Sequence, residues 1–492
     1  MVTLLFIAIQ ADPTIETCVS KAAIACGVTR DRGGWELTGT TQSNGTTAHT
    51  RLVFDGSDRF VEIDRGPIAV STGFDGRTAW TLGPSGVPHT DILEDRDVNR
   101  LVKWVLNGDW CRPAAPVQLK LTGAGTILMT PTDGTVPATL TLDPVTGLPK
   151  SLLLYTLGGD RNVNFSAYKQ FGLRQFPTHV SARGGDDPSD EFFTAGRRFA
   201  APQSLFRMPE PDELGATFDP KIGGRIPIKR VLGYAFVHPT VNGIDVGWFM
   251  LDSGAAGLVL DTAAATECHT VVIGHTKVTG ISASAEAKIV RADSFHLGPL
   301  TLHRPLFGSL DLRSVVRMFP LKIGGICGYD LLARCDLEID PYATTMTLHP
   351  PGRGPLPAGA AWSPIEFFSG IMCLRCRYQG DHDGWFLLDT GSGDALDFTS
   401  TEVLGQNLLK GRETETTHAD GIGGGEDFEA GALTWFQIAR QRLTDLSAGF
   451  HTTKKGVFAS PYLAGIAGNQ ILSLFHVVID YRNQRISLSW PA

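Results

Sequence analysis

The feature that most constrains the fold of this chain is a tripeptide that occurs twice. Residues 252–254 read Asp-Ser-Gly and residues 389–391 read Asp-Thr-Gly, and each tripeptide follows a short apolar run. All of these residue types favour turns, so each copy predicts a carboxylate that leaves a buried strand and enters a tight turn. A single turn of this kind arises easily by chance, and the rest of the sequence must support it.

The residues after each tripeptide repeat as well. An apolar segment that ends in glycine follows each motif at a similar distance, with Gly328 in the first copy and Gly468 in the second. From these glycines the spacing to the next aspartate, Asp340 or Asp480, is identical, and an apolar strand then ends at a matching distance. Landmarks that recur in order at matched spacing indicate an internal repeat. The two tripeptides therefore occupy the same position in a duplicated domain.

Breaker-rich segments divide the chain around this repeat. Proline and acidic residues in 201–220 predict a linker, and a second Pro- and Gly-rich stretch, 351–364, separates the two copies. The copies are therefore placed at 221–350 and 365–492. Residues 12–200 contain short alternating apolar runs bounded by turns, which predicts a β-rich accessory domain built as an antiparallel meander.

Three further patterns lie in the N-terminal part. Residues 1–11 have the apolar core and small-residue exit of an export signal but lack a basic start. They predict an exported protein, periplasmic or extracellular, and the alternative is a buried first strand or helical turn. Residues 95–106 place their apolar side chains on one helical face. Cys18 and Cys26 could form a disulfide, which would fit an oxidising compartment.

Composition excludes several functional classes. A net charge of −8 and a pI near 5.9 argue against nucleic-acid binding, because no basic surface is available to neutralise phosphates. No apolar run is long enough for a transmembrane helix. Cys373 and Cys376 have the spacing of a metal or redox motif, but no second pair completes a zinc site and no helix start follows. We expect structural cysteines, no metal and no cofactor.

Two carboxylates on matching turns suggest a specific chemistry. Like carboxyl groups held close together cannot both ionise, so they share one proton and titrate as a pair. The ionised member can take a proton from a bound water while the protonated member polarises a carbonyl group. A domain with one such turn must dimerise to build the pair, whereas a chain with two can build it internally.

In these features the chain resembles the retropepsin-like and pepsin-like aspartic proteases, over a little more than half of its length. The resemblance implies two tandem retropepsin-like β-barrels related by a pseudo-twofold axis, and hence a mainly β fold class. It also implies an aspartic endopeptidase that acts on polypeptides as a monomer, with Asp252 and Asp389 as the catalytic residues. The residues that would support the two loops through hydroxyl hydrogen bonds and close backbone approach are Ser253, Gly254, Thr390 and Gly391.

Enzymes of this family also need a flap, which is a β-hairpin that closes over the peptide and excludes water. The Gly-rich segment 419–425 fits this role in the second copy, and 279–284 holds the matching position in the first. A phosphate-binding loop is the alternative for the glycine run, but no Lys-Ser/Thr at a helix start follows. The flap candidates are Gly280, Ile281, Gly421, Ile422, Gly423 and Gly424.

The two halves of the predicted enzyme are not equivalent. Ala255 and Ala256 follow the first tripeptide, whereas serine and glycine follow the second. After the glycine that ends the later apolar segment, the first copy has Asp330 and the second has Asn469. We interpret Asp330 as a structural loop acid. The alternative function is a non-catalytic peptide- or lipid-binding envelope protein that retains the fold. Turns in the N-terminal domain are loosely similar to those of envelope lipoprotein-carrier half-barrels, although any β-meander could use them.

Overall fold

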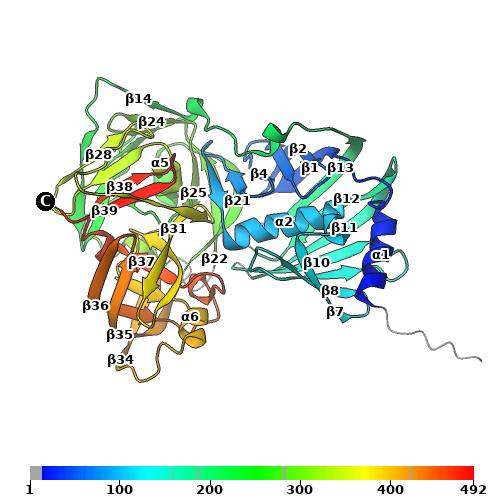
Figure 1. Cartoon of the computed structure of the whole chain (residues 1–492). Coiled ribbons are helices and arrows are strands. Elements are labelled where there is room, and N and C mark those ends of the chain that lie inside the picture. Colours follow the sequence, from blue (N-terminus) through cyan, green and yellow to red (C-terminus); the bar gives the residue numbers. More distant parts are fainter. Residues whose placement is uncertain (1–13, 158, 186–187, 281–283, 422–423, 492) are drawn as a thin grey trace, which may run out of the picture.

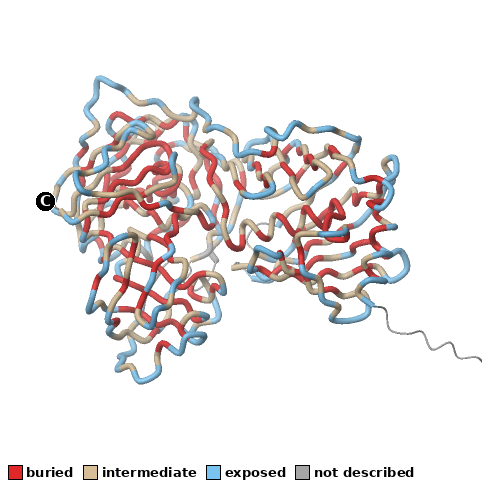
Figure 2. Tube along the Cα trace, in the orientation of Figure 1, coloured by how far each residue is buried: buried red, intermediate tan, exposed pale blue. Residues whose placement is uncertain are grey.

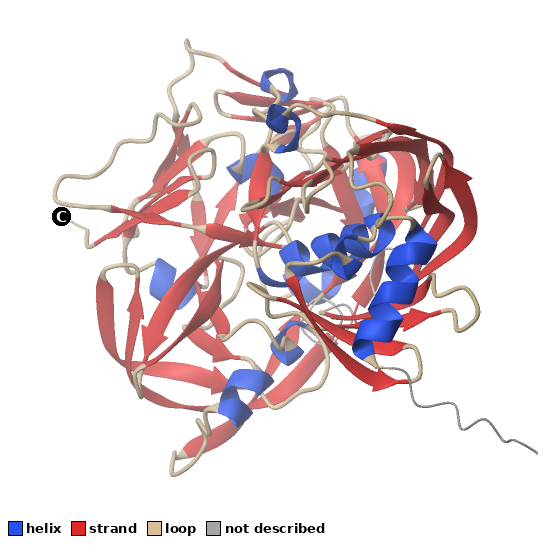
Figure 3. Ribbon diagram, turned by 45° about the vertical axis from the view of Figure 1, so that its right-hand side comes forward, coloured by secondary structure: helices blue, strands red, loops and turns tan. Residues whose placement is uncertain are grey.

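A computed structural model of the chain describes residues 14–157, 159–185, 188–280, 284–421 and 424–491 (Figure 1). The export signal predicted at 1–11 lies outside these residues. Strands dominate the described residues and form four sheets, while the helices are short and few (Figure 3). The predicted mainly β fold class is confirmed.

The N-terminal region is a curved antiparallel sheet with two helices packed on it (Figure 1). Helix α1 (Ile15–Cys26) was not predicted, whereas α2 (Leu93–Asn107) contains the predicted helical stretch. Both helices share one buried apolar core with the strands. The strands are β1 (Trp35–Ser43), β2 (Thr46–Phe54), β3 (Phe60–Arg65), β4 (Ser71–Phe74), β5 (Ala79–Leu82), β6 (Pro88–Asp91), β7 (Val117–Gly123), β8 (Thr126–Pro131), β9 (Ala138–Leu142), β10 (Pro149–Thr156), β11 (Gly159–Phe171), β12 (Arg174–Arg183) and β13 (Ser189–Arg198).

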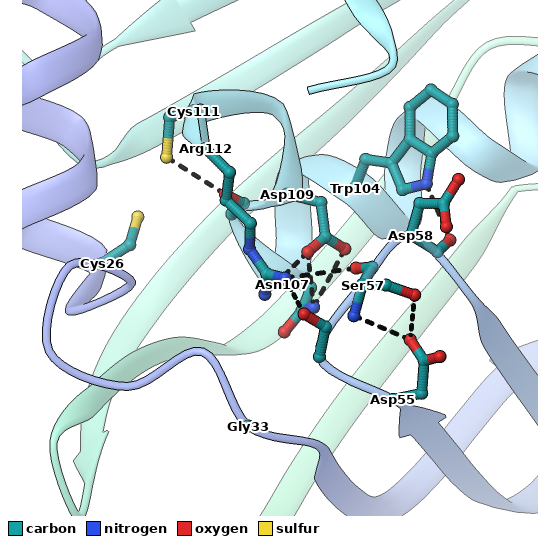
Figure 4. A network of polar contacts seen from close by, with 12 residues as sticks. Cys26, Gly33, Asp55, Ser57, Asp58, Trp104, Asn107, Asp109, Cys111 and Arg112 are labelled. Carbon is teal, nitrogen blue, oxygen red and sulfur yellow. Dashed lines mark hydrogen bonds and ion pairs between the residues drawn. The ribbon is translucent and has the colours of Figure 1, made fainter. Parts of the chain in front are cut away.

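A buried polar network fixes the end of α2 (Figure 4). Asp109 accepts hydrogen bonds from the Asn107 side chain at 2.9 and 3.0 Å and pairs with Arg112 at 2.8 Å. Burial raises the pKa of Asp109 to about 7. Cys26 and Cys111 lie beside this network as free thiols, and Cys18 is free as well, so the structure contains no Cys18–Cys26 disulfide.

The first repeat begins in the segment predicted as a linker. That segment contains the buried Phe206, whose carbonyl accepts from Trp80 Nε1 at 2.9 Å, and it ends in the first strand of this group. The strands are β14 (Ala216–Phe218), β15 (Arg225–Pro227), β16 (Lys229–Val231), β17 (Tyr234–Val237), β18 (Thr240–Val241), β19 (Trp248–Leu251), β20 (Leu258–Asp261), β21 (Val271–Thr279), β22 (Ser284–Arg291), β23 (Ser294–Leu297), β24 (Leu300–His303), β25 (Leu306–Leu310), β26 (Ile323–Cys327), β27 (Asp336–Ile339) and β28 (Thr345–His349). The helices are α3 (Thr262–Glu267), α4 (Arg313–Val316) and α5 (Tyr329–Leu332).

The second repeat is smaller and has fewer strands than the first. Its strands are β29 (Trp362–Pro364), β30 (Glu366–Phe368), β31 (Ile371–Tyr378), β32 (His382–Asp389), β33 (Leu396–Phe398), β34 (Thr414–Gly421), β35 (Gly424–Ile438), β36 (Gln441–Phe450), β37 (Gly465–Gly468), β38 (His476–Asp480) and β39 (Arg485–Ser489). The helices are α6 (Ser400–Gly405) and α7 (Asn469–Leu472). The predicted C-x-x-C pair lies in β31, where both thiols are free and buried.

Strand pairing shows that the two repeats share one topology. In each repeat the strand that carries the tripeptide runs parallel to the apolar strand that ends in glycine, β19 with β26 and β32 with β37. The glycine-terminated strand, β26 or β37, also pairs antiparallel with the strand that follows the tripeptide, β20 or β33. The tripeptide loop is therefore held between two strands of a buried sheet, which limits its freedom.

A six-stranded sheet joins the repeats. Its order is β15-β28-β27-β38-β39-β29, and β27 pairs with β38 across the pseudo-twofold axis, with Leu337 opposite Ile479. Tyr329, Phe367 and Tyr481 cluster above this junction with ring centroids 5.0 to 5.7 Å apart. Buried residues continue from one repeat into the other without a break (Figure 2).

The N-terminal region is joined to the repeats by main-chain pairing as well as by side chains. Strand β6 lies parallel to β30, with Asp91 opposite Phe367, and the Ile92 amide donates to the Phe367 carbonyl at 3.2 Å. The turn between β1 and β2 contacts β21, where the His275 amide donates to the Asn44 carbonyl at 2.9 Å. The N-terminal region therefore contacts both repeats through main-chain hydrogen bonds.

Candidate active site

The two tripeptides place their aspartates at equivalent points. Asp252 directly follows β19, and Asp389 is the last residue of β32. Each carboxyl group accepts a hydrogen bond from the amide two residues on, Gly254 to Asp252 at 2.8 Å and Gly391 to Asp389 at 2.7 Å. Each aspartate side chain is thus held by an amide of its own loop, independently of any contact between the repeats.

The carboxyl groups of the two repeats meet each other. A Cβ atom added to Gly254 would collide with the Asp389 carboxyl, and one added to Gly391 would collide with the Asp252 carboxyl in the same way. The two carboxyl groups also share a hydrogen bond. Glycine is therefore required at both positions by close approach, and the two repeats contribute one carboxyl each to a single pair.

Crossed hydroxyl hydrogen bonds lock the two loops together. Ser253 Oγ donates to the Leu388 carbonyl at 2.7 Å and accepts from the Thr390 amide at 3.0 Å. Thr390 Oγ1 donates to the Leu251 carbonyl at 3.0 Å and accepts from the Ser253 amide at 3.0 Å. Each hydroxyl thus bridges two backbone groups of the opposite repeat. All four predicted support residues, the two hydroxyls and the two glycines, lie in this arrangement.

The pKa of each of the two carboxyl groups is raised in the folded chain. Burial, followed by the charge of Asp389, raises the pKa of Asp252 well above its usual range. Burial also raises the pKa of Asp389, although the hydrogen bonds from Asp252 and from the Gly391 and Ser392 amides oppose that rise. The Ser392 amide lies 3.1 Å from Asp389 Oδ1. Each carboxyl group thus has amide donors in its own loop, and the pKa of both is raised, which is the behaviour of a pair that shares one proton.

Neighbouring side chains distinguish the two halves. Asp330, which we predicted to be structural, accepts from the Leu258 amide at 3.1 Å, and burial raises its pKa to about 6. The residue at the same position after Gly468 is Gln470, whose Nε2 donates to the Gly393 carbonyl at 2.8 Å, while the neighbouring Asn469 donates to the Gly233 carbonyl at 2.7 Å. Sequence reasoning missed Tyr234, whose hydroxyl lies against Gly393 and whose pKa is raised by burial and by the charges of Asp394, Asp389 and Asp252. No local signal marks this tyrosine.

The flap candidates lie on two antiparallel hairpins, β21–β22 and β34–β35. The Gly280 carbonyl, next to the first tip, accepts from the Val457 amide of the other repeat at 3.4 Å. Gly421 and Gly424 are paired at the second tip, and β34 contacts α4 of the first repeat. Each hairpin thus contacts the opposite repeat. Three predicted flap residues, Ile281, Ile422 and Gly423, lie outside the described residues.

Two classes of site are absent from the described part of the chain. No group of His, Cys, Asp and Glu side chains there has the arrangement of a metal centre. No described helix is long and apolar enough to cross a membrane. The histidines of the first repeat instead have local partners, such as His303 with Thr217 at 3.0 Å and His296 with Thr301 at 2.9 Å.

The site belongs to a class in which two β-domains each contribute an aspartate to one carboxyl pair. Residues 237–331, which lie within the first repeat, match the model of the aspartyl protease family. No curated protein matches the chain. Among solved structures, an aspartic proteinase from Irpex lacteus is 14% identical with a TM-score of 0.37, covering 55% of this chain and 98% of its own. A LolA superfamily protein from Nitrosomonas europaea is 14% identical with a TM-score of 0.30, covering 40% and 98%. Both TM-scores are low, so neither likeness supports a function for this chain.

Proposed function

We propose that the chain is an aspartic endopeptidase in which Asp252 and Asp389 activate one water molecule for attack on a peptide bond. The observation that carries this proposal is the reciprocal approach of each carboxyl group to the glycine of the opposite loop. A structural turn would not need a second carboxylate at this position, and bringing two carboxyl groups together raises the cost of ionising them. Active sites commonly contain such perturbed acids.

The proposal gives each member of the pair one role. Asp389 Oδ1 accepts from the amides of Gly391 and Ser392, which favours the ionised form. Asp252 holds the shared proton. In the proposed reaction Asp389 removes a proton from the water while Asp252 transfers its proton to the scissile carbonyl oxygen, which gives a neutral gem-diol. The gem-diol then collapses as Asp389 passes its proton to the leaving amine and Asp252 takes the proton of one hydroxyl, so no covalent enzyme intermediate forms.

The fold supplies what the chemistry needs around the pair. The crossed hydrogen bonds of Ser253 and Thr390 fix the distance between the carboxyl groups, which holds the water in one position. In the proposed enzyme the hairpins β21–β22 and β34–β35 cover the bound polypeptide and exclude bulk water from it, and their antiparallel pairing supports this role. Because each chain contains both aspartates, the proposed enzyme acts as a monomer.

Single substitutions test the proposal. Asp252→Asn and Asp389→Asn should each abolish cleavage of an unfolded protein mixture, followed by mass spectrometry from pH 3 to pH 8. The surface variant Asp381→Asn, whose side chain is 85% exposed, serves as the matched control and should cleave like the wild type. Circular dichroism must show that all three variants are folded. If Asp252→Asn or Asp389→Asn cleaves as fast as the wild type, the assignment of these two aspartates, the catalytic dyad, is refuted.

Binding of a transition-state analogue distinguishes the protease from the alternative, a non-catalytic peptide-binding protein. A statine-type peptide carries a hydroxyl in place of the gem-diol, so an active dyad should bind it and be inhibited by it. If the wild-type chain binds this peptide but cleaves no substrate at any pH, the chain is a peptide-binding protein that retains the fold.

A further inference from the structure

A buried histidine in the second repeat bridges two carboxylates. His451 follows β36, and its ring lies between Asp397 of β33 and Glu426 of β35. Its Nε2 is 3.0 Å from Asp397 Oδ1 and its Nδ1 is 2.6 Å from Glu426 Oε1. The side chains are almost inaccessible, with 1% of His451, 4% of Asp397 and 10% of Glu426 exposed. None of the three belongs to the proposed catalytic machinery.

Hydrogen-bond accounting favours one protonation state for this cluster. An ionised carboxylate only accepts, so both ring nitrogens must donate, and only the imidazolium form carries both protons. Glu426 depends on this bond, because its other oxygen is buried without a hydrogen-bond partner among the described residues. Phe428 and Phe458 stack on the ring, with centroids 4.6 and 3.6 Å away, which also favours a cation.

The first repeat shows that the fold does not require these charges. Val259 faces Gly308 in the first repeat as Asp397 faces Gly449 in the second, so this pairing aligns the two repeats. Leu310 then matches His451, two residues after the aligned glycine. The cross-strand pairs Ile289–Gly308 and Ala430–Gly449 match Ala285 to Glu426 in the same way. The first repeat therefore has valine, leucine and alanine where the second has aspartate, histidine and glutamate.

The cluster connects two parts of the proposed active site. Glu426 lies two residues after the start of β35, near the tip of the second hairpin, while Asp397 lies on the strand behind the dyad loop. The negative charge of Asp397 is among the causes that raise the pKa of Asp389. The charged groups that face His451 are Asp397, Glu426 and Asp394, the last from the loop after Gly391.

We propose that His451 is a positioning residue whose doubly protonated ring clamps the β34–β35 hairpin onto the strand behind Asp389. As the pH rises and the ring loses its second proton, one carboxylate loses its donor and the clamp loosens. As a regulator of cleavage the clamp rests on the proposed protease function, but its effect on the hairpin does not.

Hydrogen exchange measures the clamp without using activity. Amide exchange of residues 424–438, corrected for the intrinsic pH effect, should accelerate by at least about tenfold from pH 5 to pH 8, the cost of one charge-assisted hydrogen bond. The matched variant Asp397→Val/His451→Leu/Glu426→Ala carries the residues of the first repeat and should show no such change. The hairpin of the first repeat, 284–291, is the internal control. Equal pH dependence in both proteins would overturn the proposal.

A second measurement keeps the proposal testable if the triple variant does not fold. Nitrogen chemical shifts of the His451 ring in the wild-type chain, assigned with His451→Gln, should show both nitrogens protonated while the hairpin is protected. The ring should lose one proton over the same pH interval in which protection falls. A ring that stays in one protonation state across that interval would exclude the clamp.

The catalytic consequence is measured separately. With an active wild-type chain, KM should rise with increasing pH, and the triple variant should lack this rise. Exchange in Asp252→Asn should keep its dependence on pH, because this variant retains the clamp. If no protein cleaves substrate but the wild-type exchange result stands, the protease proposal fails and the clamp survives.

Discussion

The crossed hydroxyl bonds make a quantitative prediction for Thr390→Val, which keeps the shape of the side chain but removes its oxygen. The Leu251 carbonyl loses a donor and the Ser253 amide loses its acceptor. Two net hydrogen bonds contribute roughly 0.5–1.5 kcal/mol each, and burying their partners unsatisfied adds to the cost. We expect the free energy of unfolding to fall by about 2–4 kcal/mol.

Thr390→Ser is the control, because it keeps the hydroxyl and loses one methyl group. We expect it to cost about 1 kcal/mol or less. Urea unfolding followed by both fluorescence and circular dichroism gives the free energies, and agreement of the two probes tests whether the transition is two-state. If valine costs no more than serine at this position, the hydroxyl does not hold the loops together.

A double-mutant cycle with Ser253→Ala extends the test. The Ser253 side chain is buried and makes the symmetry-related pair of bonds. Because both hydroxyls belong to one network, the two costs should not add. Loss of either should also reduce cleavage by about 10- to 100-fold, since a misplacement near 1 Å is enough to disturb the dyad. Additive costs together with unchanged cleavage would contradict this description of the loops.

Three further predictions concern packing, charge and the junction of the domains. Gly254→Ala should destabilise the fold by about 1–3 kcal/mol and abolish cleavage because its Cβ collides with Asp389, whereas Gly405→Ala, in open space, should be neutral or slightly stabilising; thermal unfolding compares them. The raised pKa of Asp252 adds stability below its unfolded value that is lost as the pH rises through its folded value, so Asp252→Asn should gain stability over the wild type at pH 8 but not at pH 4 in urea titrations. Phe367→Ala removes a fully buried ring from the junction with β6 and should cost about 3–5 kcal/mol, and calorimetry should then show the N-terminal region melting separately.

The sequence predicted the strands that carry the aspartates because duplication provides an internal comparison. The spacing from Gly328 and Gly468 to the following aspartates reflects two copies of one sheet, in which β26 and β37 lie beside the tripeptide strands. Helix α1 was missed even though Thr14 caps its start and Gly27 ends it with φ +77°. Its twelve residues follow the segment predicted as an export signal, and turn-forming residues such as Thr14 and Gly27 mark loops as readily as helix ends.

Other features could not be predicted because they depend on contacts between distant segments. The pairing of β6 with β30 joins residues far apart in the chain through backbone groups, which leave no pattern in the side chains. His451 stands in a sequence with no motif, and only strand register brings it between Asp397 and Glu426. The repeat supplied a usable signal, since the aligned copies differ at these three positions. However, the two copies could be aligned residue by residue only with the structure.

Mixing the two dyad variants tests the central claim most directly. Asp252→Asn and Asp389→Asn chains, each inactive alone, are combined in equal amounts, and cleavage of an unfolded substrate is compared with that of the wild-type chain. If the dyad forms within one chain, the mixture stays as inactive as its components while the wild type cleaves. Cleavage by either variant alone, or its recovery in the mixture, would contradict a single intramolecular pair of carboxyl groups.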